Sequence, residues 1–133
     1  MFYANKAYLE GEVPVGAIIV IENKIIARAY NQIEKLNDVT AHAEMLALTS
    51  ASNFTNSKYL NQCSIYSTLE PCYMCAGALL LSKIGTIIYS TSDPENGGFS
   101  NGIELSKKTT IRKGILLDES KALIKKFFKG KRI

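Results

Sequence analysis

Two short motifs that lie far apart in the sequence place the strongest constraint on how this chain folds. His42 stands two residues before Glu44, and Cys72 and Cys75 follow Pro71. One imidazole and two thiolates form a ligand set for zinc, which binds nitrogen and sulfur in a tetrahedral arrangement. The motifs therefore predict a fold in which the starts of two helices meet at one edge of a sheet.

Both motifs are predicted to lie at helix N-termini. Pro71 is well placed to open one helix, in whose first turn the two sulfurs lie on one side. The free N–H groups of that turn favour ionised thiols, the form that binds metal. Thr40 is predicted to cap a second helix over residues 41–51, which carries His42.

Glu44 is predicted to be a catalytic group. Residues two apart on a helix do not share a face, so Glu44 should not bind the metal beside His42. Three protein ligands leave the fourth position to water, whose pKa falls to roughly 7 on zinc. Glu44 would take a proton from that water and pass it to a substrate nitrogen. This is the chemistry of hydrolytic deamination.

The cysteines allow two other interpretations. A structural zinc site would need Cys63 as its fourth ligand. Cys63 begins an apolar strand and Cys72 follows its far end, about 20 Å away at the usual rise per residue. A redox pair at Cys72 and Cys75 leaves His42 and Glu44 without a role. Cys63 is therefore expected to be a buried, inert thiol.

The rest of the sequence alternates between strand-like and helix-like segments, which predicts an α/β fold with a mixed sheet between layers of helices. The expected helices cover residues 2–10, 41–51, 72–83 and the C-terminal end, and the expected strands cover residues 16–21, 24–30, 63–69, 86–90 and 110–116. Asn23 and Lys24 are predicted to form a hairpin turn, and Gly85 is predicted to end the third helix. Helical crossovers should make the later strands parallel.

Composition is that of a single small domain over residues 1–133. The chain is 47% hydrophobic, enough for one core, and its three cysteines make no disulfide framework. The longest apolar run, residues 15–21, is far shorter than the roughly 20 residues needed to cross a bilayer. We expect a cytoplasmic protein with no membrane partner.

The C-terminal end is basic. Six of the sixteen lysines and arginines fall between Lys121 and Arg132, and no acid follows Glu119. Such a segment either contacts a phosphate backbone or forms a solvated helix face. Phe127 and Phe128 lie four residues after Leu123 and Ile124, a spacing more typical of core residues than of base-stacking residues.

The motifs closely resemble those of the bacterial tRNA-specific adenosine deaminases, in the cytidine deaminase superfamily, from about Glu12 to Arg132. The segments that carry the resemblance are residues 12–17, 40–44 and 68–78, an Asp93, Pro94 loop with Gly97 and Gly98, and the Phe127, Phe128 helix. The resemblance implies a three-layer α/β/α fold with a five-stranded sheet. It also implies a homodimer with one zinc per subunit, in which the neighbouring subunit completes the site.

The implied reaction converts the wobble adenosine of a tRNA anticodon to inosine, by attack of zinc-activated water on C6 of a flipped adenine. His42, Cys72 and Cys75 would hold zinc, and Glu44 would move the proton. The implied substrate contacts are Asn31, Gly16, Ala17, Ala41 and Pro71. The implied contacts to the anticodon stem-loop are Asp93, Pro94, Phe128, Lys131 and Arg132.

Several of these residues have a plainer interpretation. Asn31 suits a turn, glycine in a strand often marks a bulge, and the Asp93, Pro94 segment suits a surface turn.

The sequence also departs from the family pattern. Val39 replaces a proline, Glu95 replaces a common lysine and so repels phosphate, and the 102–110 stretch is shorter.

Two alternative functions share parts of this pattern. A deaminase of a free base or nucleotide, such as guanine or cytosine, would use the same zinc ligands. A non-catalytic zinc or RNA-binding module would have no need of Glu44. The residues 13–15 and the basic tail favour tRNA, although both are weaker signals than the metal ligands.

Overall fold

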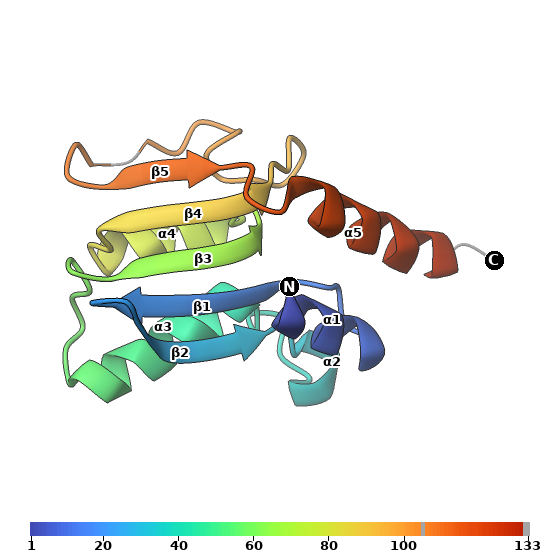
Figure 1. The fold of residues 1–133 in the computed structure, drawn as a ribbon, viewed down its shortest axis with the longest axis horizontal. Coiled ribbons are helices and arrows are strands. Elements are labelled where there is room, and N and C mark those ends of the chain that lie inside the picture. Colours follow the sequence, from blue (N-terminus) through green and yellow to red (C-terminus); the bar gives the residue numbers. More distant parts are fainter. Residues whose placement is uncertain (105, 132–133) are drawn as a thin grey trace.

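The computed structural model describes residues 1–104 and 106–131. A five-stranded sheet forms its centre, in the order β2-β1-β3-β4-β5 (Figure 1). The strands are β1 (Gly16–Ile21), β2 (Lys24–Tyr30), β3 (Ser64–Leu69), β4 (Thr86–Thr91) and β5 (Thr110–Lys113). β1 is antiparallel to both of its neighbours, whereas β3, β4 and β5 are parallel to one another. The predicted mixed sheet is therefore confirmed.

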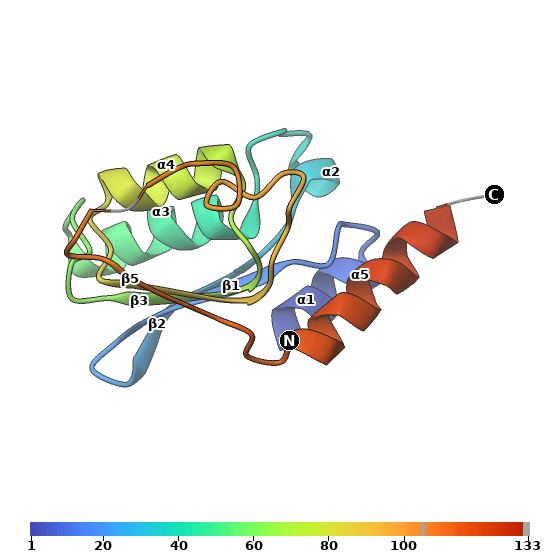
Figure 2. The same cartoon turned by 90° about the horizontal axis from the view of Figure 1, so that it is seen from above.

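Helices lie on both sides of this sheet. They are α1 (Phe2–Leu9), α2 (Ile33–Leu36), α3 (Ala43–Thr55), α4 (Tyr73–Leu81) and α5 (Leu117–Lys131). Figure 2 shows α3 and α4 side by side on one face, with α1 and α5 on the other side, towards one end of the strands. The three-layer arrangement is as predicted. No helix among the described residues is long and apolar enough to cross a membrane.

The core lies between the sheet and α3. Ile19, Ile65 and Ile87 occupy neighbouring positions on β1, β3 and β4, and all three are fully buried. The α3 side chains in this core are Leu48 and three fully buried alanines, Ala43, Ala47 and Ala51. Small side chains let the helix approach the sheet closely. The start of α3 is thereby held at a fixed position beside the sheet edge.

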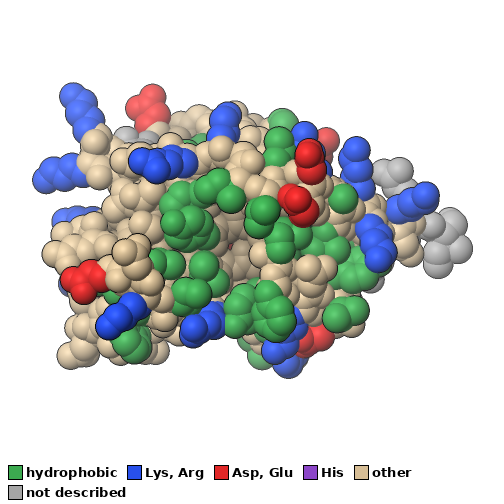
Figure 3. Space-filling model, in the orientation of Figure 1, with side chains coloured by type: hydrophobic (Ala, Val, Ile, Leu, Met, Phe, Trp, Pro, Cys, Tyr) green, Lys and Arg blue, Asp and Glu red, His purple; other side chains and the backbone are tan. Residues whose placement is uncertain are grey.

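The opposite face of the sheet is only partly covered. Figure 3, in the orientation of Figure 1, shows apolar side chains near the middle of this face. Ile18, Tyr66 and Ile88 pair across β1, β3 and β4 and alternate with the core isoleucines, so they point away from α3. Tyr66 is 39% exposed. These residues line a hollow of about 190 Å³ beside the start of α1.

The hairpin turn between β1 and β2 differs from the prediction. The hairpin turn consists of Glu22 and Asn23, which both have positive φ, and Lys24 already pairs with Ile21. Two consecutive left-handed residues match the twist of the strands they join. Between β4 and β5 the described residues contain no helix. Residues 92–104 and 106–109 form turns and irregular segments instead, and β4 and β5 are nevertheless parallel.

Helix and strand boundaries also shift. α3 begins after His42 rather than after Thr40, whose hydroxyl donates to Asp38 instead. α4 begins after Cys72, with Pro71 one residue further out, and ends at Leu81.

Turns after α4 and β5 use residues that the prediction missed. Lys83, with a φ of 56°, takes the left-handed position predicted for Gly85. Gly85 is needed for space, because a Cβ there would lie 2.5 Å from the Asn61 carbonyl oxygen. β5 ends at Lys113 because Gly114 and Leu116, both with positive φ, turn the chain into α5.

Candidate active site

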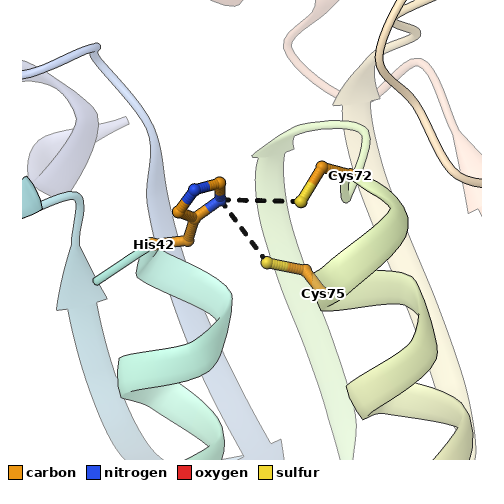
Figure 4. Close-up of side chains that lie close together, drawn as sticks. All are labelled: His42, Cys72 and Cys75. Carbon is orange, nitrogen blue, oxygen red and sulfur yellow. Dashed lines mark hydrogen bonds between the residues drawn. The ribbon is translucent and has the colours of Figure 1, made fainter. Parts of the chain in front are cut away.

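The three proposed metal ligands meet where α3 and α4 begin. His42 and Cys72 are the residues that immediately precede the two helices, and Cys75 lies in the first turn of α4 (Figure 4). His42 Nδ1 lies 3.7 Å from Cys72 Sγ and 3.6 Å from Cys75 Sγ. Zinc–sulfur and zinc–nitrogen bonds at a tetrahedral angle require a separation of about 3.6 Å. The donor set therefore fits tetrahedral zinc.

The remaining side of this cluster opens into a pocket. Cys75 is fully buried, whereas His42 and Cys72 are half-buried. The adjoining pocket has a volume of about 220 Å³. Its lining residues are Val13, Val15, Asn31, Ile33, His42, Glu44, Leu69, Glu70, Cys72, Asp93 and Asn96. Three ligands with one open side are typical of a catalytic zinc site rather than a structural one.

Cys63 lies outside this cluster. The groups of described residues that offer three close ligand atoms contain only His42, Cys72 and Cys75. Cys63 is buried just before β3, and burial raises the pKa of its thiol. A high pKa keeps a thiol in its unreactive protonated form.

Electrostatics within the cluster favour a thiolate. The hydrogen bond with Cys75 lowers the pKa of Cys72 to about 4, and contact with His42 acts in the same direction. The pKa of Cys75 is raised by that same hydrogen bond and by burial. The two thiols therefore share one proton, and contact with Cys72 raises the pKa of His42. A divalent cation at this position would displace the shared proton, because coordination deprotonates a thiol.

Glu44 is a buried carboxylate at the edge of the pocket. Its side chain is 3% exposed, and burial raises its pKa to about 6. Its Oε1 atom is buried and has no hydrogen-bond partner in the part of the chain that the structure describes. A buried acceptor without a partner needs a ligand or a water to satisfy it. A pKa near neutrality suits a group that accepts and returns a proton.

Asn31 connects the end of β2 to the start of α3. Its Oδ1 accepts a hydrogen bond of 2.8 Å from the N–H of Ala43, the first residue of α3. This satisfies one of the N–H groups that a helix leaves free at its start. Asn31 is only 5% exposed and lines the pocket, and its Nδ2 has no partner among the described residues. The amide nitrogen is thus available to a ligand.

The other expected substrate contacts are placed differently. Gly16 and Ala17 line the hollow on the opposite side of the sheet, whereas the preceding Val13 and Val15 line the pocket. Gly16 is required by α1, because a Cβ there would lie 2.6 Å from the backbone nitrogen of Ala4. Gly16 and Ala17 are thus absent from the described lining of the pocket, and their contact with the substrate stays a prediction.

Ala41 and Pro71 are buried next to His42 and Cys72 but do not line the pocket. Their carbonyl groups accept hydrogen bonds from the N–H groups of Gln32 and Gly98. Both residues hold loops in place instead.

The sequence did not predict that the pocket lining includes Ile33, Leu69, Glu70 and Asn96. Of these, only Glu70 carries a signal, as an acid directly before the Pro71 motif.

Two of the expected RNA contacts, Asp93 and Phe128, line a second, larger groove. Asp93 lines both the pocket and this groove, which has a volume of about 500 Å³ and runs towards α5. Phe128, which is 48% exposed, lies on its far side with Lys121 and Lys125. Lysine and arginine side chains gather over α5 at the right of Figure 3. Pro94 is exposed nearby.

Two of the expected contacts are not described by the structure. Arg132 and the side chain of Lys131 lie outside the described residues. Phe127, by contrast, packs edge-on against Tyr8 of α1 with a centroid separation of 6.4 Å. The two adjacent phenylalanines therefore have different environments, one in an interhelix contact and the other on the groove.

Comparison with known proteins agrees with this site. A family model described as the cytidine and deoxycytidylate deaminase zinc-binding region matches residues 2–91. The tRNA-specific adenosine deaminase of Aquifex aeolicus (strain VF5) is 45% identical over 95% of this chain and 87% of that protein. The protein of the same name from Agrobacterium fabrum is 35% identical over 98% of this chain and 90% of its own length.

Solved structures show the same fold. One, from a study of A-to-I editing by tRNA:A34 deaminases at the wobble position of transfer RNA, superposes with a TM-score of 0.85. It is 33% identical and covers 92% of this chain and 93% of its own. A guanine deaminase from Nitrosomonas europaea, at 24% identity and a TM-score of 0.77, covers 95% of this chain and 78% of its own.

The chain therefore belongs to the zinc-binding cytidine and deoxycytidylate deaminase family. Within that family, the identity and coverage of the two relatives make it a member of the tRNA-specific adenosine deaminases.

Proposed function

We propose that this protein deaminates adenosine to inosine at the wobble position of a tRNA anticodon and releases ammonia. The observation that carries the proposal is the buried Glu44 carboxylate with a free Oε1, beside three ligands that fit zinc. Bound zinc supplies the Lewis acidity that brings the pKa of water towards neutrality. The relatives named for tRNA support the choice of substrate.

The chain's own residues move the proton and hold the base. Glu44 takes up the proton that water loses as the oxygen adds to C6 of adenine. Glu44 delivers this proton to ring nitrogen N1 and then moves the remaining hydroxyl proton to the amino nitrogen, which leaves as ammonia, while C6 becomes the carbonyl of inosine. The Asn31 Nδ2 group donates a hydrogen bond to an acceptor of the base, because its Oδ1 is already used by Ala43. His42, Cys72 and Cys75 are the proposed zinc ligands.

We assign the groove beside the pocket to the anticodon loop around the reacting adenosine. Lys121 and Lys125 lie on this groove and suit phosphate groups, and the exposed ring of Phe128 suits stacking on a base. Asp93 and Pro94 would contact the loop where the groove joins the pocket, and Lys131 and Arg132 would extend the basic surface. An anticodon loop already exposes its bases, so flipping one costs little.

Residues 1–133 are proposed to form one deaminase domain that pairs with a second copy of the chain. Tyr73 and Leu81 lie two turns apart on α4 and are 52% and 80% exposed. Large apolar side chains exposed on a helix that leads away from the site support a subunit contact there. Because tRNA is the proposed substrate, we place this dimer in the cytoplasm.

The test is direct deamination by zinc-loaded protein. The substrates are an anticodon stem-loop RNA with adenosine at the wobble position and, separately, free adenosine, cytidine, cytosine and guanine, with mass spectrometry of the products. Inosine in the RNA alone is the expected result. Product from a free base or nucleoside alone would keep the site chemistry and overturn the tRNA substrate. No product from any of them, with zinc bound, would favour a non-catalytic module.

A further inference from the structure

One wall of the pocket is a loop that lies directly against the segment carrying Cys72. Asp93 and Asn96, both in this loop, line the pocket, and the Asn96 N–H donates to Asp93 Oδ1. The Gly98 N–H donates to the Pro71 carbonyl at 2.8 Å, and Gly97 forms an isolated bridge with Cys72. Residues 93–100, hereafter the 93–100 loop, are thus aligned with the proposed zinc ligand by backbone contacts.

The side chain of Glu70 holds both ends of this loop. Glu70 is 2% exposed. Its Oε1 accepts hydrogen bonds from the Asp93 N–H at 3.1 Å and from the Ser100 hydroxyl at 2.6 Å. Its Oε2 accepts the Ser100 N–H at 2.9 Å. A buried carboxylate with three donors is well satisfied, and both ends of the loop depend on it.

The loop closes on Glu70 without spare room. A Cβ on Gly97 would lie 2.0 Å from Glu70 Oε2 and 2.5 Å from the Asp93 carbonyl oxygen. A Cβ on Gly98 would lie 2.7 Å from the Cβ of Ala76 in α4. Neither Gly97 nor Gly98 has a positive φ, so glycine is needed at these positions for space and not for backbone conformation.

We propose that Glu70 is a positioning residue that holds the 93–100 loop, and with it Asp93 and Asn96, in place for the substrate. Its two oxygens are occupied by the loop, so it acts through the loop and not on the reacting atoms. The inference rests on the proposed deaminase function. It predicts that loss of the Glu70 contacts weakens RNA binding more than it slows the chemical step.

The main variant is Glu70→Gln, which keeps the size of the side chain. The N–H groups of Asp93 and Ser100 face different oxygens, so the new NH₂ group faces an N–H in either orientation. Ser100→Ala removes only the hydroxyl contact. Thr109→Val is the matched control, because it removes a hydroxyl that binds the Ile84 carbonyl at the far end of the same connection.

The readouts are zinc content, kcat and KM on the stem-loop RNA, and amide hydrogen exchange. Glu70→Gln should keep zinc, raise KM about tenfold to a hundredfold with a smaller change in kcat, and speed exchange at Asp93 and Ser100. Ser100→Ala should give a smaller rise in KM, and Thr109→Val none. Unchanged KM for Glu70→Gln would overturn the proposal, even if exchange in the loop increased.

A second variant covers the case in which Glu70→Gln loses zinc or unfolds. Gly97→Ala leaves Glu70 intact and displaces the loop from the other side. A rise in KM with zinc retained would support the proposal, and wild-type kinetics would overturn it. If the wild type itself deaminates no RNA, the proposed function is wrong. Amide exchange in the same variants then decides whether Glu70 holds the loop.

Discussion

The buried position of Glu44 suits proton transfer but costs stability. Burial raises its pKa to about 6 and leaves Oε1 without a protein partner. An unsatisfied buried acceptor costs stability, about 1–3 kcal/mol. The fold tolerates this cost at the point where a ligand is expected to bind, so stability and activity should respond in opposite ways to substitution.

Glu44→Gln should therefore retain zinc and fold at least as stably as the wild type while losing deamination. Without a group that accepts the proton, the rate should fall by about 10²–10⁴-fold or more. Inosine formation on the stem-loop and metal analysis of the purified variant check both parts. Activity above one tenth of the wild-type rate would show that another group moves the proton.

Substitution should separate the two roles of the Asn31 amide, in which Oδ1 accepts the Ala43 N–H and Nδ2 donates to the base. Asn31→Ala removes the acceptor for the Ala43 N–H and should destabilise the protein by about 1 kcal/mol. Asn31→Asp keeps an acceptor at the start of α3 but has no Nδ2 donor. It should retain stability in urea unfolding and still lose activity. An active Asn31→Asp variant would contradict the proposed contact with the base.

At the scale of elements, α5 is attached to the body of the protein along one side. The Ser120 hydroxyl, which is buried, donates to the Thr68 carbonyl, and Phe127 packs against Tyr8. The spacing in the sequence predicted core positions for both phenylalanines. Only Phe127 fits that pattern, because Phe128 lies on the side of the helix that faces the groove.

Alanine substitution of Phe127 should affect stability, whereas substitution of Phe128 should affect RNA binding. Phe127→Ala removes a partly buried ring and should cost about 1–2 kcal/mol of stability, less than a fully buried phenylalanine. Phe128→Ala should change stability by less than about 0.5 kcal/mol but weaken RNA binding by about 1–3 kcal/mol. Urea unfolding and RNA titration distinguish them. Equal effects on both measurements would refute the assignment of Phe128 to the RNA surface.

At the scale of the whole molecule, the proposed zinc ligands join two helices that are distant in sequence. A ligand that binds only the folded state raises its stability, by about 4 kcal/mol at 1,000 times the dissociation constant. Removing zinc with a chelator should therefore lower the thermal unfolding midpoint, and adding zinc should restore it. Cys75→Ala should show a much smaller response. A midpoint that does not respond to the chelator would contradict the assignment.

The proposed dimer predicts a difference between two exposed leucines. Leu81 on α4 is 80% exposed and Leu9 on α1 is 82% exposed, but only Leu81 lies on the proposed contact. Light scattering should give about twice the 14.7 kDa chain mass for the wild type and for Leu9→Glu. Leu81→Glu should be monomeric. A dimer in all three proteins would move the contact to another surface.

Features that depend on neighbours along the chain follow from the amino-acid sequence alone. Cysteines three apart place both sulfurs at the start of one helix, and the apolar runs give the strands. Local periodicity is enough for these, because each contact spans a few residues.

The pocket walls depend on contacts between parts of the chain that are distant in sequence. The Ala43 N–H binds Asn31 in place of the predicted Thr40 cap, Gly16 makes room for α1, and Glu70 binds donors 23 and 30 residues later. Such contacts join groups that no local pattern pairs. They form because buried polar groups must find partners wherever the packed elements bring them together.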